Sequence, residues 1–134
     1  MRKQQFAIHL DPHTGVPAYR QIIDQVTGGI ASGALAPGDQ LPTVRQLAVD
    51  LAINPNTVIR AYRELEIRGF LDTQQGSGTF VSQQRVQQDD LARQRRLNQL
   101  VSEFVARVGS AGFSVQEVLE QLQEISPESQ KKRK

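Results

Sequence analysis

LPTVRQLAVDLAINPNTVIRAYRELEIRG, residues 41–69, contains two helical patterns joined by a short turn. Apolar residues of the first pattern recur at helical spacing and share one face: Val44, Leu47, Ala48 and Leu51. The second pattern has the same spacing: Val58, Ala61, Tyr62 and Leu65. Asn54 and Pro55 suit the cap and first turn of a helix, and Gly69 suits a helix end. The stretch therefore predicts a helix–turn–helix whose turn is AINPN, residues 52–56.

The flanking residues add a helix before this unit and a strand hairpin after it. From Pro17 to Gly33, apolar residues fall on one helical stripe: Tyr19, Ile22, Ile23, Val26 and Ile30. Gly28 and Gly29 weaken this helix internally, which predicts close packing there. Residues 70–74 and 79–82 predict two strands around the turn QGSG. Together these elements predict a winged helix–turn–helix domain over residues 1–82.

The N-terminal residues have a different pattern. Phe6, Ile8 and Leu10 alternate with more polar neighbours, which is typical of a short strand, and DPHTG (11–15) follows as a turn.

The C-terminal part predicts two helices. After the polar stretch QQRVQQDD (83–90), a helical stripe begins near Leu91 and has coiled-coil spacing: Leu97, Val101, Phe104 and Val108. GSAG (109–112) ends it, and Ser114 with Glu117 form a capping box for a last helix that stops before Pro127. That helix carries a second apolar stripe: Val118, Leu119, Leu122 and Ile125.

Two helices with one apolar face each bury too little surface to be stable alone. We therefore expect residues 83–128 to form a helical hairpin that dimerises, and the two stripes to be the dimer contacts. Residues 129–134 are expected to form a disordered basic tail. The expected fold class is α+β, a winged helix–turn–helix followed by a short all-α two-helix segment.

Composition excludes several classes of protein. The 134-residue chain lacks cysteine, which excludes thiolate metal sites and cysteine nucleophiles. Lysine occurs only at positions 3, 131, 132 and 134, so an interior Schiff-base lysine is excluded. We expect no enzyme, cofactor or metal, no membrane segment, and a cytoplasmic location. The net charge of +2 is small, so a nucleic-acid site must be a local patch.

Such a patch is expected where the second helix of the helix–turn–helix would enter a DNA major groove. Its first turns carry groups that contact base edges or phosphates: Asn54, Asn56, Thr57, Arg60 and Arg63. Arg45 is placed to reach phosphate or the groove edge, and the hairpin tip Gln75-Gly76-Ser77 to approach the backbone or the minor groove. The alternative is a winged helix that binds protein and not DNA.

Four motifs resemble those of the GntR-type bacterial transcription regulators, in the order that the family has them. They are PAYRQI (17–22), SGALAPGDQLPTVRQLA (32–48), INPNTVIRAYRELEIRGFL (53–71) and GSGTFV (76–81). INPNTVIRAY is similar to the YtrA-type branch. The resemblance implies a DNA-binding repressor that acts as a homodimer on a pseudo-palindromic operator. It also implies a set of DNA-facing residues: Thr43, Arg45, Asn54, Pro55, Asn56, Thr57, Gln75 and Gly76.

The sequence departs from this family's pattern at two positions, one of which, Pro55, is in that set. Many relatives have an arginine where this chain has Pro55 and a basic residue where it has Ile59. Asparagine-based readout therefore gains weight over guanine readout by arginine.

Several residues have other interpretations. Arg60 and Arg63 can pair with Glu64, Glu66 or Asp50 instead of DNA. His9, Asp11 and His13 have metal-ligand spacing, but a fourth ligand is missing. A small effector, which the sequence does not identify, would be expected at the dimer seam.

Overall fold

A computed structural model describes residues 6–83 and 90–125 of the chain. Contacts divide the chain into two compact units, Met1–Arg85 and Val86–Lys134. The expected basic tail at 129–134, Pro127 and most of the polar stretch 83–90 lie outside the described residues.

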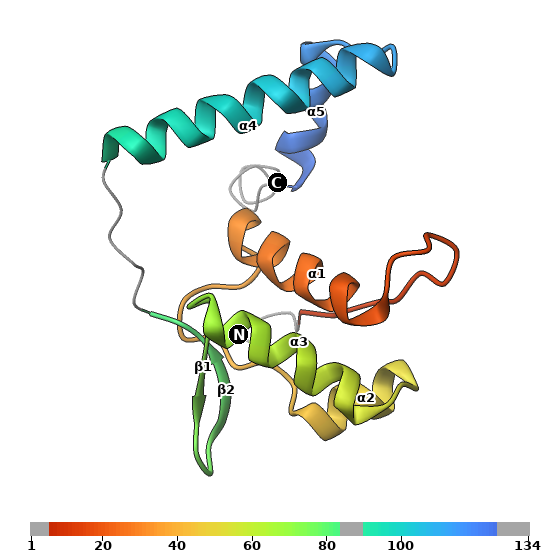
Figure 1. Cartoon of the computed structure of the whole chain (residues 1–134), viewed down its shortest axis with the longest axis vertical. Helices are drawn as coiled ribbons and strands as arrows, with labels where there is room; N and C mark the ends of the chain where they lie inside the picture. The colour runs from red at the N-terminus through yellow and green to blue at the C-terminus, as the bar shows by residue number, and fades with distance from the viewer. Residues whose placement is uncertain (1–5, 84–89, 126–134) are drawn as a thin grey trace, which may run out of the picture. The chain divides into compact units, whose positions relative to one another are not determined.

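The first unit is a winged helix–turn–helix, as the sequence predicts (Figure 1). Its elements, in chain order, are α1 (Ala18–Ser32), α2 (Val44–Leu51), α3 (Pro55–Ile67), β1 (Leu71–Gln74) and β2 (Gly78–Val81).

The core of this unit lies between the three helices and the base of the hairpin. It is formed by Ile22, Ile23 and Val26 of α1, Leu47 and Ala48 of α2, Val58, Ala61, Tyr62 and Leu65 of α3, and Ile8, Leu35, Leu41, Leu71 and Val81 from the other segments. The Tyr62 hydroxyl donates a hydrogen bond of 2.7 Å to the carbonyl oxygen of Pro42. Burial raises the pKa of Tyr62 far above its usual range, so the hydroxyl keeps its proton and this bond. The bond fastens α3 to the residue before the α2 cap.

α1 begins after Pro17 and ends at Gly33, whose φ of 87° is the left-handed conformation that glycine tolerates. Close packing occurs at Gly29, where an added Cβ would lie 2.7 Å from Cε1 of Phe6. At Gly28 such a Cβ would meet no atom within 4 Å other than those of its chain neighbours and of its own helix backbone. The expectation of close packing is therefore confirmed for Gly29 and wrong for Gly28.

Residues 6–10 form no strand and pair with no strand of the described residues, which corrects the strand prediction. Ile8 is buried in the core, so the alternation of apolar residues does reflect packing. The backbone groups bond to α1 side chains instead. The Gln25 amide accepts from the His9 N–H (3.0 Å) and donates to the His9 carbonyl (2.6 Å). The Gln21 amide does the same for Asp11, at 2.8 and 2.9 Å.

β1 and β2 form an antiparallel hairpin, the wing, in which Leu71 pairs with Val81 and Gln74 with Gly78. β1 begins one residue later than the sequence predicts and ends where it predicts, and β2 begins and ends one residue earlier. The connector before α2 pairs with the outer side of β2. The Leu41 N–H donates to the Thr79 carbonyl and the Val81 N–H donates to the Asp39 carbonyl, both at 2.8 Å. The wing is thereby fixed to the residues that lead into α2.

The second unit contains α4 (Asp90–Ser110) and α5 (Val115–Ile125). The predicted capping box is present: the Ser114 N–H donates to the Glu117 carboxylate (2.8 Å), and the Glu117 N–H donates to the Ser114 hydroxyl (3.2 Å). Neither helix contains a buried residue. Among the described helices, none combines the length and apolar character that crossing a membrane requires.

Candidate nucleic-acid interface

The turn between α2 and α3 places the start of α3 on the surface. Ala52 ends α2 in the left-handed conformation (φ 55°) and reverses the chain. Asn54 then caps α3: its Oδ1 accepts a hydrogen bond of 2.8 Å from the Asn56 N–H. Pro55 occupies the first helical position, where no N–H is needed. Because Asn54 does the capping, the side-chain amide of Asn56 is not used for that purpose.

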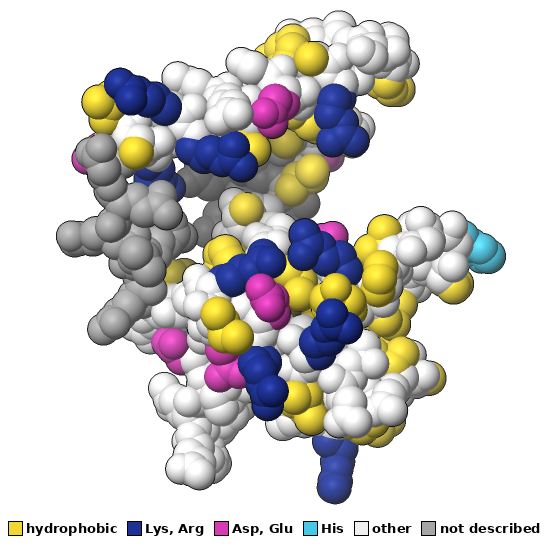
Figure 2. Space-filling model, in the orientation of Figure 1, with side chains coloured by type: hydrophobic (Ala, Val, Ile, Leu, Met, Phe, Trp, Pro, Cys, Tyr) yellow, Lys and Arg dark blue, Asp and Glu magenta, His cyan; other side chains and the backbone are white. Residues whose placement is uncertain are grey.

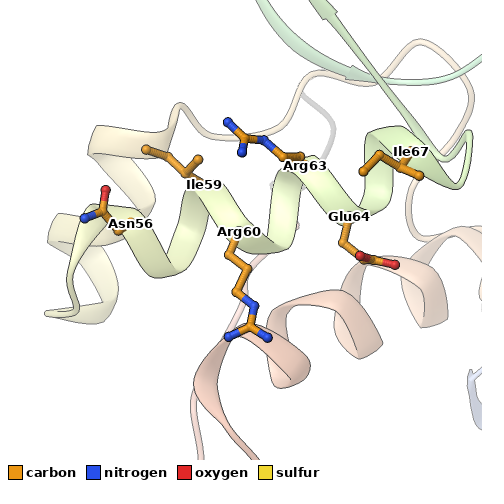
Figure 3. Close-up of a pocket in the computed structure, with 6 residues that line it drawn as sticks. All are labelled: Asn56, Ile59, Arg60, Arg63, Glu64 and Ile67. Carbon is orange, nitrogen blue, oxygen red and sulfur yellow. The ribbon is translucent and has the colours of Figure 1, made fainter.

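The solvent-facing side of α3 is a shallow depression (Figure 3). It is lined by Asn56, Ile59, Arg60, Arg63, Glu64 and Ile67. The two arginines point in different directions. Arg60 points toward α1, where its guanidinium carbon lies 3.7 Å from the ring centroid of Tyr19. Arg63 and Ile59 point to the other side of the helix.

The alternative ion pairs of Arg60 and Arg63 with Glu64, Glu66 or Asp50 are absent from residues 6–83. Glu64 accepts from Arg68 at 2.9 Å, and Glu66 accepts from the Thr73 hydroxyl at 2.6 Å. Within the two described stretches, the exposed Arg63 has no carboxylate partner. Arg60 is therefore held by a cation–π contact, and Arg63 is the cation available on this face.

At the start of α2, as at the start of α3, one side chain caps the helix and another is exposed. The Thr43 hydroxyl caps the helix by accepting from the Gln46 N–H at 3.0 Å. Gln46 in turn donates to Asp50 at 2.8 Å. Arg45 is exposed and lies off the buried face, as the sequence predicts. Its guanidinium is not engaged by any carboxylate in the described part of the chain.

The wing tip is exposed at Gln75, Gly76 and Ser77. The Ser77 N–H donates to the Gln74 carbonyl at 2.9 Å, and Gly76 adopts a φ of 83°. Gln40 of the connector donates to the Ser77 carbonyl at 3.2 Å. The tip is thus braced from the α2 side while its side chains remain accessible.

The residues proposed for DNA contact all lie in the first unit, and all but the half-buried Thr57 are exposed. Figure 2 shows basic side chains on the face over α3 and α1, mixed with hydrophobic and a few acidic ones. Sequence reasoning noted Ile59 only as a departure from the family and did not place it in the site. Its spacing from Asn56, three residues along the helix, was the signal for it.

Of His9, Asp11 and His13, the Asp11 side chain has a structural role. Its carboxylate accepts a hydrogen bond of 2.9 Å from the backbone N–H of His13, which closes the turn before α1. In the described residues, no group of three His, Cys, Asp or Glu side chains is arranged to hold a metal ion.

Residues 18–81 match the family model described as bacterial regulatory proteins, gntR family. The chain is similar to the HTH-type transcriptional repressor YtrA of Bacillus subtilis (strain 168), with 34% identity over 119 residues that cover 89% of this chain and 92% of the relative. It is also similar to the uncharacterized HTH-type transcriptional regulator YhcF of that organism, with 36% identity over 104 residues that cover 78% of this chain and 85% of the relative. A solved structure of YtrA from Sulfolobus acidocaldarius, a GntR-family transcription factor, has a TM-score of 0.53 and 30% identity, and covers 88% of this chain and 95% of that chain. These matches extend beyond the first unit into the C-terminal helices.

Proposed function

The chain belongs to the gntR family of bacterial regulatory proteins, and we propose that it represses transcription by binding a pseudo-palindromic DNA operator as a homodimer. Its full-length relatives are transcription regulators, which favours this function over a winged helix that binds only protein. No catalytic activity or cofactor is part of the proposal. Since the proposed target is chromosomal DNA, we place the protein in the cytoplasm.

The observation that carries the proposal is the exposed face at the start of α3. Asn56 offers an amide that can donate to and accept from an adenine edge, and capping does not occupy it. Arg63 and Arg45 add positive charge on α3 and at the start of α2. A helix whose first turns present an amide and nearby cations suits entry into a major groove.

The DNA contacts that we propose on α3 and the turn before it are Asn54, Pro55, Asn56, Thr57 and Arg60. Of these, Arg60 stacks on Tyr19 and would have to leave that ring to reach DNA, whereas Arg63 is exposed without such a contact. The start of α2 adds Thr43 and Arg45, and the wing adds Gln75, Gly76 and Ser77. Asn54 and Thr43 already serve as helix caps, so we expect them to act through backbone position and their remaining polar hydrogens.

The dimer is proposed to form through residues 83–128. A groove between α4 and α5 is lined mainly by apolar side chains, among them Phe104, Val108, Phe113, Val118, Leu122 and Ile125. The side chains of Leu97, Val101, Phe104, Leu119, Leu122 and Ile125 are about half exposed, from 48% to 57%. A hairpin with no buried residue needs a further layer, and a second copy of the hairpin supplies one.

A two-fold dimer presents two copies of α3 related by the same symmetry. The DNA that it reads is therefore expected to contain two inverted half-sites, about one helical turn or a multiple of a turn apart. If a small effector controls the protein, the α4–α5 groove at the dimer seam is its proposed position.

The test is selection of genomic DNA fragments by the full-length protein, followed by titration of the recovered fragment and of a scrambled copy. We expect the recovered fragment to contain an inverted repeat and to bind about 10³-fold or more tightly than the scrambled copy. Affinity for both should fall steeply with salt as phosphate contacts are lost. Equal affinity for the two DNAs would refute sequence-specific regulation.

A further inference from the structure

One apolar side chain lies within the otherwise polar start of the α3 face. The helix buries Val58, Ala61, Tyr62 and Leu65 in the core, on the opposite side. Ile59 is 38% exposed and contributes to the depression on the solvent side. Its helical neighbours on this face are Asn56, three residues before it, and Arg63, four residues after it. The order along the face is therefore amide, branched alkyl group and cation.

The direction of the side chains makes Ile59 part of the surface that α3 presents. Figure 3 shows Ile59 and Arg63 on one side of the helix, whereas Arg60 turns to the other side. The contact with Tyr19 holds Arg60 there, so its guanidinium does not cover Ile59. Ile59 lies about 4.5 Å along the helix axis from Asn56, and the two side chains can therefore reach different bases of one major groove.

The chemistry of the major groove leaves one partner for such a side chain. Guanine, adenine and cytosine present donors and acceptors there, and thymine alone presents a methyl group at C5. An isoleucine against a donor or acceptor would remove water from it without replacing the hydrogen bond, which is unfavourable. Against a thymine methyl it excludes water from two apolar surfaces. As a β-branched residue in a helix, it also has few rotamers to lose.

We propose that Ile59 is a specificity-determining residue that reads thymine through its 5-methyl group, near the base that Asn56 contacts. This inference rests on the proposed function, because it assumes that α3 enters the major groove of an operator. It explains how an exposed apolar residue is used at the centre of a DNA-reading face.

The test uses the full-length protein and the selected operator, with each thymidine replaced in turn by deoxyuridine, which lacks only the methyl group. Affinities are measured by fluorescence anisotropy at one salt concentration. We expect a loss of about fourfold per methyl group at one thymine of each half-site, from the burial free energy of one methyl-sized group. Replacing a thymidine that α3 does not reach should leave the affinity unchanged.

Variants of Ile59 assign the effect to this side chain. With Ile59→Ala, the thymidine and deoxyuridine operators should bind equally at the sensitive position. Ile59→Val keeps the branched end and should keep most of the discrimination. Ile67→Ala is the matched control, because Ile67 is 74% exposed on the same helix but about 12 Å further along its axis. We expect this control to discriminate like the wild type.

The outcomes separate this inference from the proposed function. If the protein prefers its operator but no deoxyuridine substitution matters, or if Ile59→Ala keeps the discrimination, Ile59 does not read thymine. If no fragment is preferred over scrambled DNA, both the proposed function and this inference are refuted.

Discussion

Asn54 and Asn56 stand two positions apart at the start of α3 and have different tasks. Asn54 caps the helix, which leaves the Asn56 amide for an adenine edge. We expect Asn56→Ala to weaken operator binding by about 1–3 kcal/mol and to leave binding to random DNA nearly unchanged. Titration of both DNAs with the same variant provides the measurement.

Asn54→Ala provides a comparison for the effect on stability. It removes the helix cap and should lower the free energy of unfolding by about 1 kcal/mol, measured by thermal or denaturant unfolding. If Asn56→Ala lowers stability and weakens both DNAs equally, Asn56 has a structural role and does not read a base.

Arg45 is expected to contact a phosphate. Since it is exposed and off the buried face of α2, Arg45→Ala should leave the fold intact. We expect it to weaken binding to all DNA sequences alike and to reduce the slope of log affinity against log salt by about one. Arg68→Ala is the control, because Arg68 lies at the end of α3 and pairs with Glu64. An unchanged salt slope for Arg45→Ala would exclude the phosphate contact.

At the residue scale, sequence reasoning succeeds where chemistry is local and fails where partners come from elsewhere in the chain. The Asn54 cap, the Ser114–Glu117 box and the exposure of Arg45 follow from positions a few residues apart. For Arg60 the sequence left open a DNA contact or a pair with a nearby carboxylate, and it did not predict the stacking on Tyr19 of α1. That contact depends on how α1 and α3 pack, which helical spacing alone does not determine.

At the scale of one element, α1 offers a matched pair of glycines. Gly28→Ala meets no atom within 4 Å and should stabilise the protein by about 0.5–1 kcal/mol, because alanine favours a helix interior. Gly29→Ala would place its Cβ 2.7 Å from Phe6 and 3.2 Å from Leu35, so the Phe6 ring must move out of its contact. We expect a net loss of about 1–3 kcal/mol, measured by denaturant unfolding of both variants.

Equal stabilisation by Gly28→Ala and Gly29→Ala would contradict this prediction. It would mean that the Phe6 ring can move at no cost and does not contribute to the packing of α1.

The helices could be predicted because each shows a repeating apolar face and a recognisable start or stop. The segment at 6–10 could not, because the alternation of Phe6, Ile8 and Leu10 specifies which side chains are buried but not what the backbone bonds to. In the structure the partners are two glutamines of α1. The pairing of the connector at 39–41 with β2 was missed for the same reason, since one short bridge has no periodic signal.

At the scale of the whole molecule, we expect the first unit to bind DNA and the second unit to form the dimer. The first unit has its own core, so a chain that ends at Ser82 should stay folded. We expect it to sediment as a monomer and to lose most operator affinity, because the second half-site no longer binds at high effective concentration. A truncated chain that still dimerises and binds the full palindrome would place the dimer contact in the first unit.

Phe104 tests the dimer in the full-length chain. It is 50% exposed and lines the α4–α5 groove. Phe104→Asp would bring an unpaired carboxylate into the proposed contact, so the protein should sediment as a monomer and bind the operator weakly. Ser102→Asp is the control, since residue 102 lies on a different side of α4 and is polar already. Equal behaviour of the two variants would remove Phe104 from the interface.

The hydrogen bonds between the N-terminal segment and the two glutamines of α1 also affect how readily the protein aggregates. An extended segment with unpaired backbone groups can recruit a strand from another molecule and start aggregation. The groups of His9 and Asp11 point to one side of the segment, and Gln25 and Gln21 occupy them. That edge is therefore closed to strand addition by side chains, without a neighbouring strand. A chain with leucine in place of both Gln21 and Gln25 would keep side chains of similar size on α1 but would leave these backbone groups unpaired. We expect it to precipitate at a lower protein concentration than the wild type.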